Sequence, residues 1–457
     1  MFIAHVYFRR PFFRIFISFV IVAILFWMSA PAQSQEKNPD SASDLDVLLS
    51  KTKYPQLEQA LAARSKELSP KTYAYFAGVM ANRVNQVKTS LGLLEPLVPG
   101  LLISDPKRGE IALCTIADDY AKKFRYAEAA RVYGEANRIA KQLNLHSSCD
   151  ADREGSRWAL LSDAPVQTVT SSGEFTIRGK WDSVGLFQVP LTAGSYSGSW
   201  IVDSGANLSV ISQSVAERMG LEVSGAAGTA DGFSGAAFSV HIGILPELRL
   251  GSAIFQNVPV LVAADSDLNF TKLDYQIEGS LGLPELAALG RFTIDRDGRI
   301  RFGDKSKAPG NGRGPHNLFL EKFAPLITAD FGLGDQLFTI DTGAMGTILS
   351  AEFYNESKPM NSGELVELEL EGAGGTLVAP AYQVRDVLAK LGGSCAKLEH
   401  LQVLTKPTGV ADEFYGNIGQ SALSTFTSFT FDFSTMHFIV NGGGAGNCNR
   451  EDLGSGS

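Results

Sequence analysis

The chain changes its hydrophobic periodicity near Pro165. From Asp46 to about Leu160, apolar residues recur at spacings of three and four, Ala and Leu are frequent, and β-branched runs are few. This pattern predicts helices. After Pro165, the segments GEFTIRG, GLFQVPLTA, GSWIVDSG, RFTIDRDGRIRFG and SFTFDFSTMHFIV alternate apolar and polar residues between turn residues, which predicts strands. We therefore predict an all-α domain over residues 46–160, followed by an all-β region over residues 168–441.

The segment LCTIADDYAKKFRYAEAARVYGEA in the helical domain resembles a tetratricopeptide repeat. Its small and aromatic positions have the spacing of that repeat, at Ala117, Tyr120, Ala129, Tyr133 and Ala136. In such a repeat, small residues let two antiparallel helices approach closely, and aromatic rings fill the groove between them. We therefore expect tetratricopeptide-like helical hairpins. They provide either a surface that docks a protein partner or a plain helical domain that packs on its neighbour.

The β region repeats itself. The segment KSKAPGNGRGPHN predicts a linker at residues 305–316, which separates a first half (168–304) from a second half (317–441). The first half contains WIVDSGANLSVIS and the second contains FTIDTGAMGTILS, so that Asp203 and Asp341 stand 138 residues apart. One chain thus carries the same apolar-apolar-Asp-Ser/Thr-Gly-Ala stretch twice.

The similarity continues well beyond these two stretches. Gly282 follows Asp203 by 79 residues in GSLGLPELAALG, and Gly419 follows Asp341 by 78 residues in GNIGQSAL. Thirteen residues after each of these glycines, an aspartate ends an aromatic strand. A DSG or DTG tripeptide is common by chance, but two copies in matching context indicate an internal duplication.

On these motifs, IVDSGANLSVIS with GSLGLPEL and TIDTGAMGTILS with GNIGQSAL, each half resembles a retropepsin-type aspartic peptidase domain. The resemblance implies a bilobal aspartic-protease fold, in which two pseudo-symmetric β-barrel lobes each supply one catalytic aspartate, here Asp203 and Asp341. The second half departs from the family at Asn417, where an apolar residue is usual. We expect that half to differ locally, because Asn417 puts a polar group where core is expected.

The expected chemistry explains why two aspartates are needed. Two carboxylates held about 3 Å apart cannot both ionise readily, so the pair holds one proton over a mildly acidic range. The ionised member acts as general base on a water, and the protonated member donates to the scissile carbonyl. The pair titrates as one unit, so neither role is assigned to one residue. We expect the hydroxyls of Ser204 and Thr342 to orient the carboxylates. Small residues should let the two loops meet, namely Gly205, Ala206, Gly343 and Ala344.

The resemblance also implies Gly-tipped hairpin flaps that close over an extended peptide substrate. The candidates are ADGFSGAA at residues 230–237 and EGAGGTL at residues 371–377. Their turn and substrate-contact residues are Gly232, Phe233 and Gly235 in the first candidate and Gly372, Gly374 and Gly375 in the second. The helical domain is a further candidate to cover the cleft.

Residues 1–32 predict a secretory signal peptide. Three arginines precede the apolar run IFISFVIVAILFWM, and SAPAQ offers a small-residue cleavage site that ends at Ala32. The run is shorter than the about 20 residues of a typical membrane span, and a retained N-terminal anchor is the alternative. Residues 33–45 are polar and expected to be a disordered linker. We therefore expect a periplasmic or secreted protein with no stable membrane span after signal cleavage.

An even number of cysteines in an exported protein favours disulfides, and we predict the pairs Cys114–Cys149 and Cys395–Cys448. Free buried thiols are the alternative. The second pair would join the Gly-rich tail, residues 442–457, to the body of the protein. No CxxC motif is present and the six histidines are scattered, so we expect no metal and no cofactor. A net charge of −9 without Lys/Arg-rich runs argues against a nucleic-acid partner.

Three functions are consistent with these patterns. The first is an exported, single-chain aspartic endopeptidase that acts on extended polypeptides as a monomer, with its two lobes paired within the chain. The second is a catalytically silent peptide-binding or scaffold module of the cell envelope, which uses the cleft and the helical domain. In the third, the lobes face outward and each pairs with a lobe of another chain. The sequence does not predict the physiological substrate.

Overall fold

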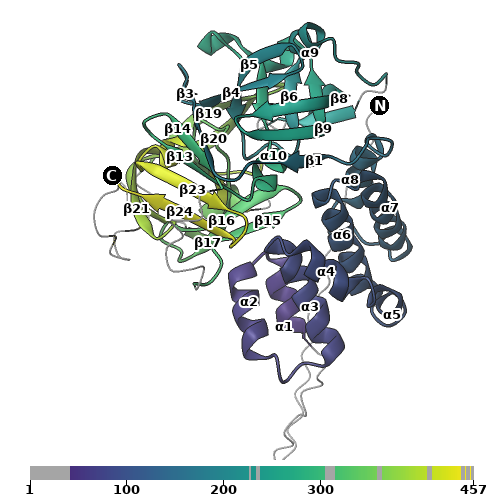
Figure 1. Ribbon diagram of the computed structural model, residues 1–457. Helices are drawn as coiled ribbons and strands as arrows, with labels where there is room; N and C mark the ends of the chain where they lie inside the picture. Colours follow the sequence, from purple (N-terminus) through teal and green to yellow (C-terminus); the bar gives the residue numbers. More distant parts are fainter. Residues whose placement is uncertain are drawn as a thin grey trace, which may run out of the picture.

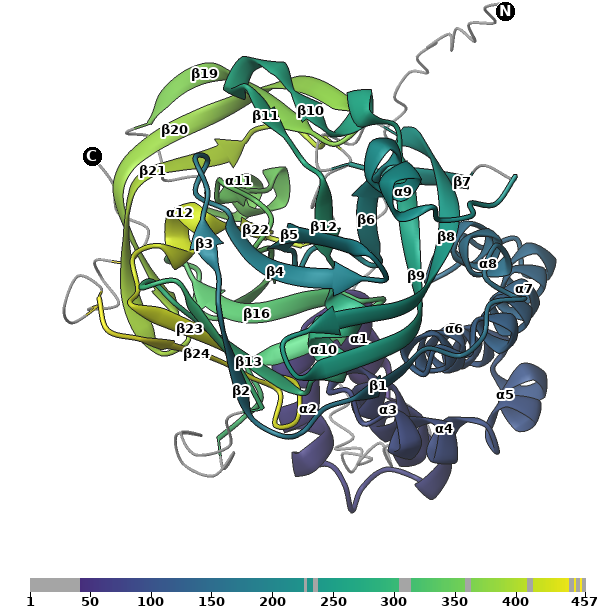
Figure 2. The ribbon, with the colours of Figure 1, turned by 45° about the horizontal axis from the view of Figure 1, so that its top comes forward.

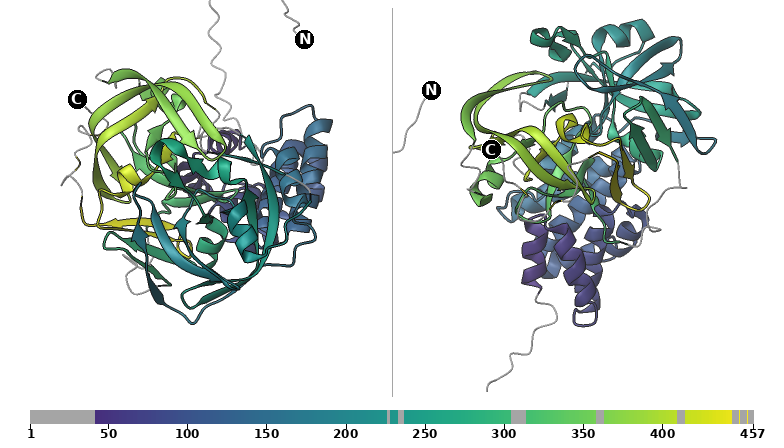
Figure 3. Two further views of the ribbon diagram at one scale, coloured as in Figure 1. Left: turned by 90° about the horizontal axis from the view of Figure 1, so that it is seen from above. Right: turned by 90° about the vertical axis from the view of Figure 1, so that its left-hand side faces the viewer.

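A computed structural model describes residues 42–225, 228–232, 237–303, 314–357, 363–408, 414–443, 448 and 453. A helical region precedes a β-rich region, as predicted, and packs against one side of it (Figures 1 and 3). The predicted signal peptide lies outside the described residues, as do most of the predicted linker at 305–316 and most of the Gly-rich tail. Within the described part of the chain, no single helix is long and apolar enough to cross a membrane. The bent pair Val87–Leu94 and Val98–Ser104 meets the test by length and composition only.

The helical region contains eight described helices: α1 (Ser43–Ser50), α2 (Tyr54–Ala63), α3 (Pro70–Arg83), α4 (Val87–Leu94), α5 (Val98–Ser104), α6 (Pro106–Lys122), α7 (Tyr126–Gln142) and α8 (Ala151–Ala159). The prediction of disorder up to residue 45 is wrong at its end, because α1 begins at Ser43 and buries Leu45 and Leu49. Apolar side chains at that spacing stabilise a helix once they have a surface to pack on.

Helices α6 and α7 form a hairpin around small side chains. Ala117, Ala129 and Ala136 are fully buried, so the two helix backbones approach closely. Tyr133 is also buried, whereas Tyr120 is only partly buried. The five residues singled out in the sequence therefore lie in one helical hairpin. Whether the hairpin is a tetratricopeptide repeat stays a prediction.

The first β half forms a nine-stranded sheet in the order β1-β9-β6-β12-β5-β4-β8-β7, with β3 paired to β4. Its strands are β1 (Thr168–Thr170), β3 (Lys180–Trp181), β4 (Phe187–Ala193), β5 (Tyr196–Val202), β6 (Ser209–Ser212), β7 (Gly228–Asp231), β8 (Ala237–Leu250), β9 (Ala253–Ala263) and β12 (Gly279–Leu281). Helices α9 (Gln213–Met219) and α10 (Leu283–Ala288) follow β6 and β12, and β10 (Asn269–Phe270) pairs with β11 (Tyr275–Gln276).

The second β half forms an eight-stranded sheet in the order β15-β16-β17-β22-β18-β21-β20-β19. Its elements are β15 (Leu318–Glu321), β16 (Ala324–Asp330), β17 (Gln336–Ile340), β18 (Ile348–Leu349), α11 (Ala351–Ser357), β19 (Glu364–Gly372), β20 (Gly375–Leu391), β21 (Ser394–Leu404), β22 (Gly416–Ile418) and α12 (Gln420–Leu423). Strand β22 runs parallel to β17 and antiparallel to β18, as β12 does with β5 and β6. The duplication seen in the sequence is thus repeated in the strand pairing.

A third sheet joins the two halves. It has the order β2-β14-β13-β23-β24, with β2 (Phe175–Arg178), β13 (Arg291–Asp295), β14 (Arg299–Phe302), β23 (Ser428–Asp432) and β24 (His437–Asn441). The aromatic strands β13 and β23 pair antiparallel, with Thr293 opposite Thr430. The two threonine hydroxyls lie 2.8 Å apart, and equivalent residues of the two halves therefore meet at the centre of this sheet.

The helical region contacts both β halves. Arg83 forms a 3.4 Å ion pair with Glu321 at the end of β15, and Tyr54 donates a hydrogen bond to the same carboxylate. On the other side, Gln167, in the segment that connects α8 to β1, donates a 3.0 Å hydrogen bond to Glu285 of α10. These contacts are wholly or partly buried, so they place the helices in a defined position relative to the sheets.

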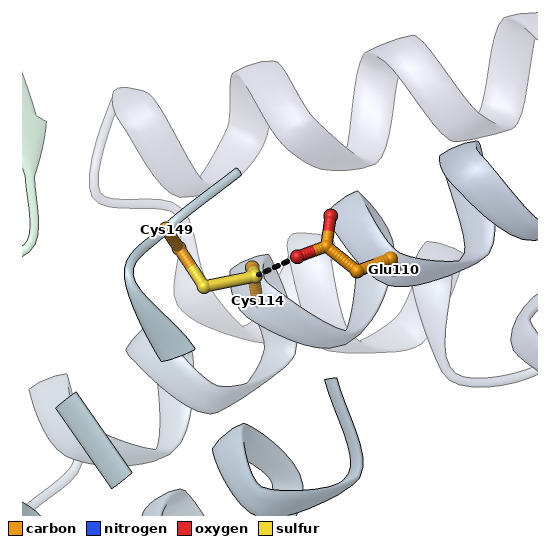
Figure 4. Close-up of side chains that lie close together, drawn as sticks. All are labelled: Glu110, Cys114 and Cys149. Atoms are coloured by element: carbon orange, nitrogen blue, oxygen red, sulfur yellow. Dashed lines mark hydrogen bonds between the residues drawn. A yellow bond between two sulfur atoms is a disulfide. The ribbon is translucent and has the colours of Figure 1, made fainter. Parts of the chain in front are cut away.

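The sulfur atoms of Cys114 and Cys149 are at bonding distance, as are those of Cys395 and Cys448, so both predicted pairings are present. Glu110 lies against the first pair (Figure 4). By distance alone, Glu110, Cys114 and Cys149 could offer three ligand atoms to a metal ion. Glu110 Oε1 instead accepts hydrogen bonds from Ser147 and Ser148. With both sulfurs in a disulfide, this donor set does not fit a metal ion.

Candidate active site

Asp203 and Asp341 occupy equivalent positions at the ends of two central strands. Asp203 follows β5 and its N–H donates to the Leu281 carbonyl over 3.0 Å, while Asp341 follows β17 and its N–H donates to the Ile418 carbonyl over 2.9 Å. Within each loop, a glycine N–H donates to the aspartate carboxylate: Gly205 to Asp203 over 3.1 Å and Gly343 to Asp341 over 2.7 Å. Each carboxylate is therefore oriented by the backbone of its own turn.

The hydroxyls of Ser204 and Thr342 cross from one half to the other. Ser204 Oγ accepts from the Thr342 N–H and donates to the Ile340 carbonyl, and Thr342 Oγ1 accepts from the Ser204 N–H and donates to the Val202 carbonyl. We expected these hydroxyls to orient the carboxylates, which stays a prediction; the hydrogen bonds that the structure gives them go to the main chain of the opposite half. Both are buried beneath the loops, where the two strand ends leave main-chain groups that need partners.

Each aspartate packs against the glycine of the opposite loop. A Cβ atom added at Gly205 would stand 2.5 Å from Asp341 Cγ, and one added at Gly343 would stand 2.6 Å from Asp203 Oδ1. Any larger residue would push the carboxylates apart. Ala206 and Ala344 follow these glycines, and their carbonyls accept the N–H groups of Leu283 and Gln420. The small residues thus bring the predicted pair together.

Burial raises the pKa of both carboxyl groups, and for Asp203 the negative charge of Asp341 and a hydrogen bond with it raise the pKa well above its usual range. Backbone hydrogen bonds from Gly343, Gly205 and Ala344 oppose the rise in the pKa of Asp341. Two interacting carboxyls in one buried site retain a proton at a pH where isolated ones have lost it. The apparent pKa values belong to the pair.

The sequence reasoning missed Ser280, which pairs with Ile201 in the β12–β5 register. Its side chain hydrogen-bonds to Asp203 and lowers the pKa of that group. The equivalent residue of β22 is Asn417, whose Oδ1 accepts a 2.7 Å hydrogen bond from Thr339. Asn417, which stands where an apolar residue was expected, is thus buried and hydrogen-bonded. The alignment of GSLG with GNIG was the signal that could have revealed Ser280.

Both aspartates lie in one cleft of about 1150 Å³ between the two β halves. Its walls are largely apolar, with Val210, Phe238 and Ile277 from the first half and Ile348 and Leu370 from the second. A cleft of this size and lining suits a ligand whose apolar side chains leave water.

Two hairpins, β7–β8 and β19–β20, contribute residues to the lining of this cleft. Predicted flap residue Gly232 follows β7, whereas Phe233 and Gly235 lie outside the described residues. The hairpin β19–β20 carries Gly372, Gly374 and Gly375, and the last two have φ values of 82° and 142°, which glycine tolerates best.

Gly232 and Phe238, which flank the tip of the first hairpin, contact the tip of the second hairpin. A Cβ at Gly232 would stand 1.7 Å from the Ala373 carbonyl oxygen, and one at Gly374 would stand 2.7 Å from the Phe238 ring. Gly374 also donates a 2.9 Å hydrogen bond to the Asp267 carbonyl, and Lys272 pairs with Glu369. The second hairpin is therefore held against the first half.

Comparisons with known proteins gave one family match over part of the chain and structural likenesses at low scores. Residues 189–284 match the family described as aspartyl protease; this stretch contains Asp203 and covers less than half of the chain.

A retropepsin-like aspartic protease from Rickettsia conorii is similar in structure at 19% identity and a TM-score of 0.21, over 30% of this chain and 91% of that one. An aspartic proteinase from Irpex lacteus is similar at 12% identity and a TM-score of 0.37, over 59% of this chain and 98% of that one. At these scores, neither structural likeness establishes an activity. No curated protein matches the chain significantly. The family match supports a protease function.

Proposed function

We propose that the protein is an aspartic endopeptidase in which Asp203 and Asp341 act as one catalytic pair. The observation that carries the proposal is the reciprocal packing of the two loops, in which Gly343 lies against the Asp203 carboxylate and Gly205 against that of Asp341. Both carboxylates thereby line one cleft. A shared site with raised pKa values is what activation of a water by two carboxylates requires.

In the proposed reaction, a water molecule binds between the two carboxylates. The ionised member accepts a proton from the water as its oxygen forms a bond to the scissile carbonyl carbon, and the protonated member donates a proton to the carbonyl oxygen. The resulting tetrahedral intermediate collapses when the C–N bond breaks: the protonated carboxyl donates its proton to the leaving nitrogen, and the ionised carboxylate accepts a proton from one hydroxyl of the intermediate. The pair ends with one proton, as it began.

The substrate we propose is an extended polypeptide with apolar side chains around the scissile bond. The apolar walls of the cleft support this, because they would cover such side chains. The hairpin β19–β20 would open to admit the chain and then close over it, and an extended peptide can add its backbone to the strands of this hairpin.

The test is proteolysis of an unfolded, internally quenched protein mixture between pH 3 and pH 7. Wild-type protein is compared with Asp203→Asn and Asp341→Asn. We expect an acidic optimum that vanishes in both variants. Asp297→Asn is the matched control, because Asp297 is half-exposed and paired with Arg299 in a surface turn, and it should cleave like wild type. Activity that survives either dyad substitution would overturn the proposal.

The alternative is a module that binds peptides without cutting them. The contacts of Gly232 with Ala373 and of Gly374 with Phe238 favour it, because hairpins held against each other can retain a ligand without turnover. The two functions separate in one experiment. Binding of an apolar peptide that persists in Asp203→Asn, together with no hydrolysis by wild type at any pH, would favour the binding module.

We also propose that the protein is exported and acts as a monomer. Export is supported by the N-terminal segment and by two cysteine pairs at disulfide distance, since disulfides persist in oxidising compartments. A monomer is supported by the sheet that joins β13 to β23 within one chain. Fractionation of the host cell and sizing of the purified protein test these two points.

A further inference from the structure

The cleft has one wall that neither β half supplies. Helix α8 contributes Arg153, Ser156 and Arg157 to the lining, and Leu160 just after the helix completes it. Residues at these spacings lie on one helical face. Figure 2 shows α8 beside β7 and β8, and Leu160 Cδ1 would stand 2.8 Å from a Cβ at Gly228 of β7.

The opposite face of α8 holds the helix in place. Ala151, Glu154 and Trp158 are buried. The Trp158 ring stacks on Tyr126 of α7 at 5.4 Å and packs on Phe323, next to β15, at 5.9 Å. Helix α8 is therefore packed between α7 and the β region. This packing fixes the position of its other face, which lines the cleft.

The charges of this wall differ from those of the rest of the cleft. Among the described lining residues, Arg153 and Arg157 are the only cations, and the other charged residues are acidic: Asp203, Asp341, Glu369 and Glu371. Arg157 Nη1 donates to both carboxylate oxygens of Glu154, at 2.9 and 3.0 Å. A guanidinium carries five N–H donors, so it can bind a second carboxylate at the same time.

We infer that α8 forms a subsite for a carboxylate of the bound polypeptide, with Arg153 and Arg157 as its cationic residues. The protein should prefer chains that carry Asp or Glu on one side of the apolar segment in the cleft. A C-terminal carboxylate offers the same chemistry. The inference rests on the proposed function for its effect on cleavage, but its effect on binding can be measured without cleavage.

The experiment uses quenched peptides that share one apolar centre and carry a Glu or a Gln at each position from three to six residues on either side. A further peptide pair has a free or an amidated C-terminus. At one position, Glu should raise kcat/KM about fivefold over Gln, mainly through KM. Arg153→Gln combined with Arg157→Gln should abolish this preference, so that the ratio of kcat/KM for the Glu and Gln peptides, measured within the variant, falls to about one. A preference for the free over the amidated terminus would assign the carboxylate to a chain end.

Two further variants keep the test decisive. Because Arg157→Gln leaves the buried Glu154 without its partner, Arg153→Glu alone is measured as well, and it should weaken the Glu preference or turn it toward Lys. Arg138→Gln is the control, since Arg138 is half-exposed on α7 and does not line the cleft. The same peptides are bound to Asp203→Asn protein and followed by fluorescence anisotropy, so the subsite is tested even if wild type cleaves nothing. A Glu preference that is absent from both assays, or unchanged in the arginine variants, would overturn the inference.

Discussion

Ser204 and Thr342 each bond to the main chain of the other β half: Ser204 Oγ donates to the Ile340 carbonyl over 2.9 Å, and Thr342 Oγ1 donates to the Val202 carbonyl over 2.6 Å. The acceptors immediately precede the loops that carry the two aspartates. Two buried hydroxyls thus determine how closely the halves approach at the point where Asp203 and Asp341 meet.

Replacing Thr342 with Val should loosen this junction. The substitution keeps the shape but leaves the Val202 carbonyl and the Ser204 N–H without their partner, at a cost of about 2–4 kcal/mol in the free energy of unfolding. Chemical denaturation measures the loss, and proteolysis should fall with it. Thr176→Val in β2, where the side chain is exposed, should change stability by less than about 0.5 kcal/mol. Equal effects of the two substitutions would contradict the role given to Thr342.

Neutralising one aspartate should stabilise the protein at neutral pH. The pKa of Asp203 is raised in the folded state, so the native protein binds more protons than the unfolded chain. Its stability therefore falls as pH rises from the ordinary aspartate pKa through the raised value. Asp203→Asn removes this dependence, and we expect a gain in stability at pH 7 but little change at pH 3. Denaturation curves at both pH values test this. A loss of stability at pH 7 would contradict the prediction, because it would show that the folded protein stabilises the ionised Asp203 carboxylate.

Adding one methyl group at Gly343 should abolish activity. The new Cβ would stand 2.6 Å from Asp203 Oδ1, so the carboxylates must separate, and we expect at least about 100-fold lower kcat because small displacements of reacting groups are costly. Gly225→Ala is the control, since a Cβ there meets nothing within 4 Å. Full activity in Gly343→Ala would mean that the two loops need not approach as closely as described.

Breaking the second disulfide should release the tail. Cys395 and Cys448 close a loop of 53 residues, and Leu453 forms an isolated bridge to Leu388 of β20. The chain-entropy estimate for such a loop is about 4 kcal/mol. The double variant Cys395→Ser, Cys448→Ser should therefore unfold at lower denaturant concentration, and limited proteolysis should remove residues after 443 first. Identical denaturation midpoints for the variant and the oxidised wild type would argue against a structural role.

The sequence by itself determined the order of helical and β regions, the internal duplication and the residues that form the aspartate loops. These follow from local periodicity and from motifs repeated at a constant offset. Both can be recognised along the chain without any knowledge of tertiary contacts. It also predicted both cysteine pairs, because each pair falls within one region of the chain.

Only the tertiary structure decided which groups the site residues touch. The hydroxyls of Ser204 and Thr342 bond to backbone carbonyls of the opposite half. Those carbonyls stand at strand ends far apart in sequence, which meet only in the folded protein. Strand register places Ser280 beside Asp203, and helix packing places α8 at the cleft. Such partners are set by long-range packing of whole elements, and a periodicity read along one segment carries no information about what lies across from it.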